Sequence, residues 1–445
     1  MTEIRITVNN TSDTGGTFLT PVWFGFHDNS FDLFNPGEAA SAGLETIAED
    51  GDAAGLGAEL VAADADGQGG IVPGAAGPIS TREQTSTTLN VNGASNAYLS
   101  LAAMLLPSND AFIGTGEAVE VFDDAGNFLG AQVVEFLGTD VYDAGTEVNT
   151  ELDAAFINQT GPNTGIDENG VVRLHPGFNG SLGNPVGEGD QIILGGTNAF
   201  GEFIDPVVAD FTQPGAEVAS VHINTVNREE GTSGQDVLLG GDDDDIFTGG
   251  NGSDLLSGRA GYDVLSGGSG ADFLFGGRGN DELDGGSGAD LLVGNSGRDT
   301  LLGGEGTDKI FAGSGDDTID GGDQRDTLFG GSGNDVISGG AGRDVILGGS
   351  GDDFIFGGTG SDFIVAGPGD DTIAYGTGDG FDTIRGFGTG DTLLLSVEGV
   401  AAFEDVLAAA TETFFGVRLD FGAGNRILLS GADLGDLEAS LFDFA

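Results

Sequence analysis

The sequence GGSGADFLF occupies residues 267–275, and GGSGNDVIS at residues 330–338 repeats its pattern. Sixteen such nine-residue units follow one another from residue 231 to residue 374 without an insertion. Every unit has Asp at position 6 and Leu, Ile or Phe at position 8. A period this strict predicts a repeat architecture in which each unit has the same local structure.

The residue types within one unit predict a metal-binding turn. Gly at positions 1, 2 and 4, as in Gly267, Gly268 and Gly270, permits positive φ and a tight turn. Such a turn points backbone carbonyls inward, and the Asp at position 6 adds a carboxylate beside them. Ligands that are all oxygen, in a loose geometry, favour Ca²⁺ over Mg²⁺. The sixteen candidate ligands are Asp236, Asp245, Asp254, Asp263, Asp272, Asp281, Asp290, Asp299, Asp308, Asp317, Asp326, Asp335, Asp344, Asp353, Asp362 and Asp371.

Positions 7 to 9 of each unit predict a short strand. Residue 8 faces away from residues 7 and 9, so the unvarying large apolar residue at position 8 is the predicted core. Two units make one coil of 18 residues, and eight coils stacked at about 4.8 Å give a rod roughly 38 Å long.

The units resemble the RTX, or haemolysin-type, calcium-binding repeats. The resemblance implies a parallel β-roll with Ca²⁺ held between turns n and n+2 on each side, hence at most 14 internal sites. In such sites the Asp carboxylates act with neighbouring carbonyls, such as those of Gly267, Gly285, Gly330 and Gly348.

Five turns depart from the pattern, and we expect weaker or missing ions there. Asp243 and Gln324 replace Gly at position 4, and Thr232, Arg259 and Asn295 replace it at position 2. A flexible Gly-rich linker, the alternative, needs neither a fixed Asp nor a fixed apolar residue.

The charge of the chain indicates folding coupled to metal binding. The net charge is −60 over 445 residues, and the repeats alone carry 27 acidic against 6 basic residues. Self-repulsion destabilises a compact metal-free state, whereas bound Ca²⁺ neutralises it. Our hypothesis is that 231–374 is largely disordered without Ca²⁺ and folds when Ca²⁺ is added.

Several functional classes are disfavoured by what the sequence lacks. With no cysteine there are no disulfides, and with only 13 Lys and Arg a nucleic-acid partner is disfavoured. The N-terminus MTEIRITVNNTSDTGG lacks the basic start and apolar run of a signal peptide, and no apolar stretch reaches the length of a membrane span. We therefore expect an extracellular or cell-surface protein that is exported without a cleaved N-terminal signal peptide.

The sequence after the last unit predicts a cap. Residues 378–395 read as a divergent final turn running into a strand, 403–411 and 432–441 as helices, and 417–421 and 426–430 as strands. This segment would cover the open end of the roll. It also resembles the C-terminal region of type I-secreted RTX proteins, and LEASLFDFA at 437–445 fits their acidic–aromatic tail. The resemblance implies the type I secretion machinery as a partner; a cap without an export role is the alternative.

Residues 1–228 differ in kind from the repeats. Strands are predicted at 4–8, 88–91, 98–105, 118–122, 132–136 and 218–225, with a short helix within 39–62. The pattern favours an antiparallel β-sandwich. The predicted organisation is all-β: a sandwich at 1–228, a parallel β-roll at 229–391, and a small α/β cap with a secretion signal at 392–445.

Three strings in the first part resemble the spondin N-terminal domain. They are GFHDNSFDLFNPGEAASAGLETIAEDGD (25–52), MLLPSNDAFIG (104–114) and YDAGTEVNTE (142–151). The resemblance implies a β-sandwich used for adhesion or matrix contact, with one Ca²⁺ site near Asp110, Asp143 and Glu147. An Asx turn after Pro107 is the alternative for Asp110. The cysteines and thrombospondin-type modules of the animal proteins are absent, so their partners do not carry over; an extracellular protein, a glycan or a cell surface remains open.

An enzyme or toxin is the alternative for the whole chain, with an active site in 1–228 and the repeats serving export. HExxH, GxSxG and cysteine nucleophiles are all absent. His27 beside Asp28 is a possible catalytic pair, but a structural histidine is the simpler interpretation. We therefore expect no catalytic residues, and no cofactor other than Ca²⁺.

The two outer faces of the predicted roll differ. Positions 7 and 9 of the odd-numbered units are apolar at 13 of 16 places, against 7 of 16 in the even-numbered units. Phe273, Phe275 and Phe329 belong to the odd face. A continuous apolar face predicts that another domain, the cap or a second copy of the chain covers it.

Overall fold

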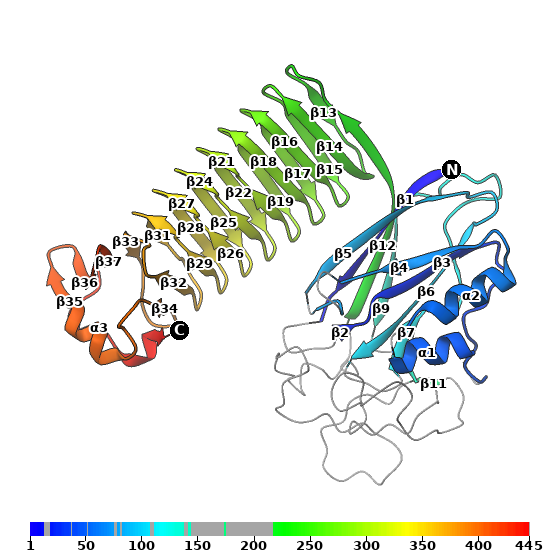
Figure 1. The fold of residues 1–445 in the computed structure, drawn as a ribbon, viewed down its shortest axis with the longest axis horizontal. Coiled ribbons are helices and arrows are strands. Elements are labelled where there is room, and N and C mark those ends of the chain that lie inside the picture. Colours follow the sequence, from blue (N-terminus) through cyan, green and yellow to red (C-terminus); the bar gives the residue numbers. More distant parts are fainter. Residues whose placement is uncertain are drawn as a thin grey trace, which may run out of the picture. The chain divides into compact units, whose positions relative to one another are not determined.

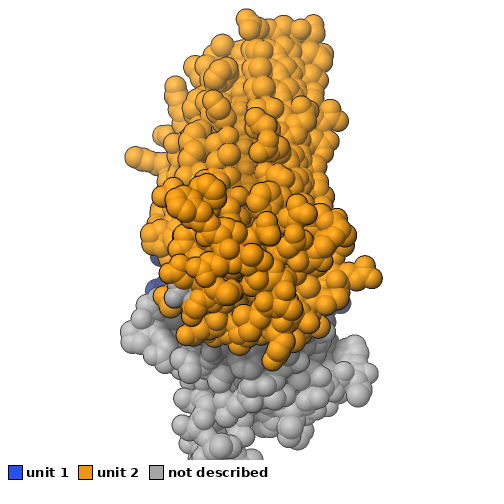
Figure 2. Space-filling view, turned by 90° about the vertical axis from the view of Figure 1, so that its left-hand side faces the viewer, with its two compact units in different colours: residues 1–225 blue, residues 226–445 orange. Residues whose placement is uncertain are grey.

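The computed structural model describes residues 1–12, 18–36, 38–50, 52–74, 78–80, 82–106, 111–137, 141–143, 173–174 and 217–444. The chain divides into two compact units, residues 1–225 and residues 226–445 (Figure 2). Each unit has its own apolar core. The three-part division predicted from the sequence stays a prediction.

Unit 1 is a β-sandwich. Its strands are β1 (Thr2–Asn10), β2 (Phe18–Leu19), β3 (Val22–His27), β4 (Gln68–Val72), β5 (Gln84–Val91), β6 (Tyr98–Leu106), β7 (Ala111–Gly114), β8 (Val119–Glu120), β9 (Gln132–Leu137), β10 (Val141–Asp143), β11 (Arg173–Leu174) and the first part of β12 (Glu217–Glu230). One antiparallel sheet runs β9-β12-β1-β5, and the other runs β11-β10-β7-β6-β3-β4. The six strands predicted from the sequence are present as β1, β5, β6, β8, β9 and β12.

Two helices cover the outer face of the second sheet (Figure 1). They are α1 (Ala42–Asp50) and α2 (Ala54–Ala63), where the sequence predicted one helix within 39–62. The helices pack closely because two glycines meet: a Cβ on Gly43 would lie 2.7 Å from the Gly55 carbonyl carbon. The break between them lets both apolar faces reach Trp23 on β3.

Unit 2 begins with a parallel β-solenoid (Figure 1). The odd-numbered units form β13 (Val237–Leu239), β15 (Leu255–Ala260), β17 (Phe273–Arg278), β19 (Leu291–Ser296), β22 (Lys309–Ser314), β25 (Thr327–Ser332), β28 (Val345–Ser350) and β31 (Phe363–Val365), continued by β33 (Phe381–Arg385). The even-numbered units form β14 (Asp244–Asn251), β16 (Val264–Gly270), β18 (Glu282–Gly288), β20 (Thr300–Leu302), β21 (Glu305–Gly306), β23 (Thr318–Asp320), β24 (Asp323–Gln324), β26 (Val336–Ser338), β27 (Ala341–Gly342), β29 (Phe354–Phe356), β30 (Thr359–Gly360) and β32 (Thr372–Gly376), continued by β34 (Thr392–Ser396). The parallel β-roll that the resemblance to the RTX repeats implied is confirmed.

The position-8 residues form the core of the roll, as predicted. Leu274 pairs with Leu292 and Leu292 with Ile310, each 18 residues further along the chain. All three side chains are fully buried. Each buried side chain of this size contributes about 1.5–3 kcal/mol relative to an exposed one.

The outward side chains of the odd sheet are partly exposed. Phe273 is 48% exposed and Phe311 38%, and the rings of Phe311 and Phe329 stack at 4.6 Å. The in-register pairing of β22 with β25 places these two rings one above the other. That another domain or a second copy covers this face stays a prediction.

A small α/β segment completes unit 2. Its elements are α3 (Phe403–Ala409), β35 (Ala410–Thr413), β36 (Gly416–Gly422), β37 (Asn425–Ser430) and β38 (Phe442–Phe444). The strand β37 pairs with β33, and β38 pairs with β34, so this segment covers the ends of both stacks of strands.

The helix predicted at 432–441 is wrong. This segment instead forms two 3₁₀ turns, Leu434–Asp436 and Ala439–Leu441. Leu437 and Phe442 both bury their side chains in the roll core. Gly435 weakens an α-helix here, and Phe442, directly after the segment, already belongs to β38, whose pairing with β34 holds the chain extended.

Candidate metal centre

The position-6 aspartates form two ladders along the turns of the roll. From Asp254 to Asp371 each of them is at most 3% exposed. The backbone N–H of each Asp donates to Oδ1 of the Asp one coil further on, for example from Asp272 to Asp290 at 2.7 Å and from Asp281 to Asp299 at 2.8 Å. One oxygen of each carboxylate is therefore satisfied by the backbone.

The second oxygen of these carboxylates has no donor among the described residues. The buried Oδ2 atoms without a hydrogen-bond partner are those of Asp254, Asp263, Asp272, Asp281, Asp290, Asp299, Asp308, Asp317, Asp326, Asp335, Asp344, Asp353, Asp362 and Asp371. Folded proteins seldom leave buried polar atoms unpaired, and an unpaired buried carboxylate is costlier still. These fourteen atoms therefore point to a ligand that the polypeptide does not supply.

Backbone carbonyls converge on the same places. A Cβ built on Gly285 would lie 2.8 Å from Asp290 Oδ2 and 2.7 Å from the carbonyl oxygen of Gly303, one coil further on. Gly303 and Gly321 repeat this arrangement with Asp308 and Asp326. Carboxylate and carbonyl oxygens within reach of one point are the donor set that Ca²⁺ takes. The oxygen atoms that these turns present fit this ion.

The side chains alone do not form a metal centre. Within the described part of the chain, no three His, Cys, Asp or Glu side chains gather closely enough to hold a metal ion by themselves. Each predicted calcium turn takes many of its ligands from backbone carbonyls. The Asp side chains of the ladder therefore do not form a group of three on their own. The predicted N-terminal site falls outside the described residues: Asp110 and Glu147 lie in undescribed segments, and only the backbone of Asp143, in β10, is described.

Burial makes the metal-free carboxylates hard to ionise. It raises the pKa of Asp281 and of Asp317 to about 8, and that of Asp299 to about 7. Neighbouring carboxylates along the ladder, such as Asp263 beside Asp281, add to the effect. The metal-free turns therefore favour protonation at a pH where an exposed Asp is ionised.

Three of the five residues that replace Gly in the turns keep a positive φ. Arg259, Asn295 and Gln324 have φ of 82°, 79° and 81°. Arg259 pairs in register with Gly277, and Gln324 with Gly342. Non-glycine residues with positive φ are strained, although Asn tolerates it better. Weaker ion binding at these turns stays a prediction.

The first two aspartates differ from the other fourteen. Asp236 Oδ2 accepts hydrogen bonds from the backbone N–H of Thr232 at 2.7 Å and from its hydroxyl at 2.9 Å. Asp245 accepts from the Gly241 N–H at 3.1 Å through Oδ2 and from the Asn227 amide at 2.7 Å through Oδ1. Protein donors thus satisfy the carboxylates at the start of the roll.

Two ladder residues were missed by the sequence reasoning. The N–H of Asp362 donates to Asp382 Oδ1 at 2.9 Å, and that of Asp371 to Asp391 Oδ1 at 3.2 Å. The spacing here is 20 residues because two extra residues interrupt the period after residue 374. The strings FDTI and GDTL keep the Asp two residues before a large apolar residue, and that signal identifies them.

His27 is a structural residue. It is fully buried, its Nδ1 accepts the Asn29 N–H at 3.1 Å, and its Nε2 lies 3.0 Å from the Ser100 hydroxyl. With Nδ1 accepting, Nε2 of the neutral ring carries the proton and donates to Ser100. Such a ring cannot take a proton from Ser100, and Ser100 is itself only 2% exposed.

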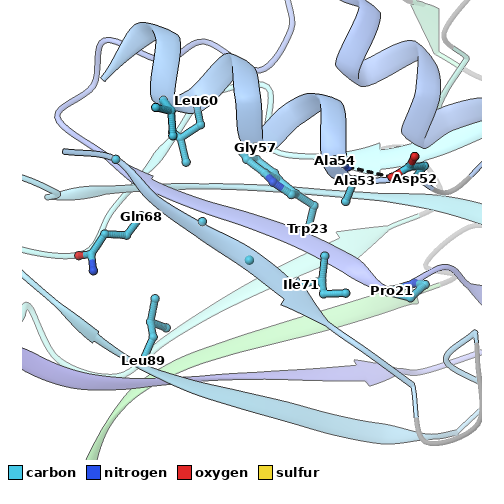
Figure 3. A pocket seen from close by; sticks show the side chains of 14 residues that line it. Pro21, Trp23, Asp52, Ala53, Ala54, Gly57, Leu60, Gln68, Ile71 and Leu89 are labelled. Atoms are coloured by element: carbon cyan, nitrogen blue, oxygen red, sulfur yellow. Dashed lines mark hydrogen bonds between the residues drawn. The ribbon is translucent and has the colours of Figure 1, made fainter. Parts of the chain in front are cut away.

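A hollow of about 830 Å³ lies beside α2 and β4 in unit 1 (Figure 3). Trp23 and Leu60 form its buried floor, while Val61 and Ile71 are 57% and 47% exposed. The lining is mainly apolar and lacks convergent charged groups. It offers a contact surface but no catalytic arrangement.

Comparison with known families agrees with this geometry. Residues 18–165 match the family model described as Spondin_N, and residues 230–382 match the model described as RTX calcium-binding nonapeptide repeat (4 copies). The chain carries RTX calcium-binding repeats and a Spondin_N domain. It is thus a calcium-binding protein of extracellular type, and RTX repeats are associated with type I secretion.

No curated protein matches the chain. Among solved structures, it is similar to the crystal structure of the extracellular lipase LipA from Serratia marcescens, with 20% identity and a TM-score of 0.18. The match covers 50% of this chain and 42% of the lipase chain, so this chain spans less than half of the lipase. Among the described helices, none has the length and hydropathy needed to span a membrane.

Proposed function

We propose that this RTX–spondin chain is a secreted, non-catalytic protein whose roll folds on binding Ca²⁺ and whose N-terminal unit makes adhesive or matrix contact. The observation that carries the proposal is the row of fourteen buried carboxylate oxygens without a protein donor. Ca²⁺ satisfies such atoms and removes the repulsion within a chain of net charge −60.

The link between folding and Ca²⁺ follows from where the ligands are. Each predicted site combines atoms from two successive coils, such as Asp290 and the Gly303 carbonyl. An unfolded chain does not bring these atoms together, so the free energy of binding adds to the free energy of folding. The chain would then remain unfolded where Ca²⁺ is scarce and fold after export into a calcium-rich exterior.

The non-catalytic part of the proposal is supported by the histidines. His27 is buried with both ring nitrogens engaged. Burial lowers the pKa of His222 to about 4, so this ring stays neutral within β12. Neither of these two histidines lines the hollow beside α2 and β4.

Circular dichroism of the full chain tests the folding step. We expect the strand signal of the roll to be lost in excess chelator and restored by Ca²⁺, but not by an equal concentration of Mg²⁺. A fully folded roll in excess chelator contradicts the proposal.

A binding screen tests the adhesive role. The full chain is applied to a glycan array and to intact cells with Ca²⁺, and again with chelator. The variant Ile71→Asp changes the rim of the hollow, and Leu129→Asp changes an exposed residue (51%) outside its lining. We expect binding that falls in the first variant and not in the second. Turnover of an ester, peptide or glycoside substrate would favour the enzyme alternative.

A further inference from the structure

A hairpin in the cap has an exposed aromatic pair at its tip. The strands β35 and β36 pair antiparallel up to Thr413↔Gly416, so the turn between them consists of Phe414 and Phe415. Phe414 is 96% exposed, the largest fraction among the large apolar residues that the structure describes, and Phe415 is 69% exposed. The two rings contact each other edge to face, with their centroids 5.3 Å apart. Both rings therefore face solvent and add little to the apolar core of the cap.

The backbone of this turn is fixed by the residues around it. The Thr413 hydroxyl accepts the Phe415 N–H at 3.2 Å and donates to the Gly416 carbonyl at 2.7 Å. The Gly431 N–H donates to the Phe415 carbonyl at 2.9 Å. Gly416 has a φ of 137°, and a Cβ there would clash with the Leu429 carbonyl, so only Gly fits. The hairpin thus presents the two rings in a fixed position, and its fold does not require their side chains.

The exposed pair is too small for a stable protein interface. At these exposed fractions the two side chains offer about 300 Å² of apolar surface, since one Phe offers roughly 150–250 Å². A standard protein interface takes about 800 Å² from each partner, which argues equally against a second copy that docks by its own tip. A protruding tip also cannot enclose a small molecule, as a pocket does. A lipid bilayer differs from these partners because it surrounds an inserted ring on all sides.

The charge of the hairpin region fits a surface without net charge. Residues 410–431 contain two acidic and two basic residues, Glu412, Asp420, Arg418 and Arg426, and have a net charge of zero within a chain of −60. Arg426 forms an ion pair with Asp420 at 3.1 Å. Within unit 2 the hairpin lies at the end away from β13 (Figure 1). Anionic headgroups repel the chain as a whole, whereas zwitterionic headgroups meet a neutral hairpin.

We propose that the cap docks on the surface of a bilayer of zwitterionic phospholipid, with Phe414 and Phe415 inserted at the boundary between headgroups and acyl chains. The hairpin needs no rearrangement, because its turn already presents both rings. The contact is peripheral and lies at the tip alone. It is separate from the adhesive contact proposed for unit 1, and neither depends on the other.

Flotation of the full chain with phosphatidylcholine vesicles tests the proposal, at saturating Ca²⁺ so that the roll is folded. The variants are Phe414→Ser, Phe415→Ser and the control Phe273→Ser, which removes a half-exposed ring from the odd sheet. We expect wild type and Phe273→Ser to float equally. Each tip variant should lower the partition into vesicles about tenfold, because one apolar ring is lost from the contact. Phe414→Trp should float like wild type, and its additional emission should shift to the blue when vesicles are added.

The opposite results are equally clear. Folded wild type that does not float, or that floats as well after Phe414→Ser, overturns the proposal. Flotation only with vesicles that contain phosphatidylserine, unchanged in Phe414→Ser, shows Ca²⁺ bridging between acidic surfaces instead. A wild-type dimer in sedimentation that Phe414→Ser converts to monomer shows that the tip binds a second copy. Circular dichroism of the same samples reports whether the roll is folded, so a failure of the calcium-dependent roll is seen separately.

Discussion

At the scale of the residue, the backbone conformation of the turns decides what a substitution does. Arg259 and Gln324 adopt positive φ in turns where the other units use Gly. The left-handed conformation costs a non-glycine residue about 1–2 kcal/mol. Arg259 and Gln324 keep this left-handed conformation because their in-register pairing with Gly277 and Gly342 holds the backbone in place.

Replacing Arg259 by Gly should therefore stabilise the roll. The free energy gained by relieving the strain is larger than the conformational-entropy cost that Gly adds on folding. The free energy of unfolding should therefore rise by about 0.5–1 kcal/mol. Urea unfolding at saturating Ca²⁺ measures it. Arg278→Gly is the control, because Arg278, at position 3 of its unit, is not among the residues with positive φ. A gain in Arg278→Gly and none in Arg259→Gly contradicts the explanation.

Truncation of a core residue should have the opposite effect. Leu292→Ala opens a cavity at a fully buried position-8 site, and we expect a loss of about 2–5 kcal/mol. Val293, the next residue, faces outward and is only partly buried, so Val293→Ala should cost about 1 kcal/mol or less. Equal losses in the two variants would contradict the inward direction of position 8. The measurement is again urea unfolding in Ca²⁺.

At the scale of the element, the ladder of aspartates links folding to pH. In the metal-free roll, burial raises the pKa of Asp281 to about 8 and that of Asp335 to about 6. An unfolded Asp has a pKa of about 3.9. The folded metal-free roll therefore binds more protons than the unfolded chain between about pH 4 and pH 8, and its free energy of unfolding rises as the pH falls.

Acid should thus substitute in part for Ca²⁺. In excess chelator, we expect the strand signal in circular dichroism to be larger at pH 5 than at pH 8. With Ca²⁺ present, protons compete for the same carboxylates, so the apparent affinity for Ca²⁺ should fall below about pH 6. A metal-free roll that becomes less ordered on acidification from pH 8 to pH 5 would contradict the buried, unpaired state of these carboxylates.

At the scale of the whole molecule, the two units should respond differently to removal of Ca²⁺. The one tryptophan of the chain, Trp23, is 1% exposed in the core under α1 and α2 of unit 1. Its fluorescence therefore reports on unit 1, while far-ultraviolet circular dichroism is dominated by the strands of the roll.

Chelation should reduce the dichroism signal and leave the tryptophan emission maximum unchanged. The sandwich has its own apolar core, so its stability does not depend on the turns of the roll. Heating or urea, which unfold both units, provides the positive control for a red shift. A red shift on chelation alone would mean that the core of unit 1 also depends on Ca²⁺.

The sequence by itself determined the roll. A fixed period places every Asp in the turns and every position-8 residue in the core, because in-register stacking gives equal positions equal surroundings. The helix predicted at 432–441 is wrong, because the contacts of Leu437 and Phe442 with distant residues decide that segment. The segment 39–62 is helical as predicted, and the contact between Gly43 and Gly55 decides that it packs as two helices.

Only the tertiary structure decided which carboxylates lack a protein donor. Asp236 and Asp254 are alike in the repeat pattern, but Thr232 satisfies the first and no described residue satisfies Oδ2 of the second. Asp382, outside the regular period, joins the ladder because β33 pairs with β31. The donors to Oδ1 along the ladder lie 18 or 20 residues away, and only the packed coils bring these neighbours into contact.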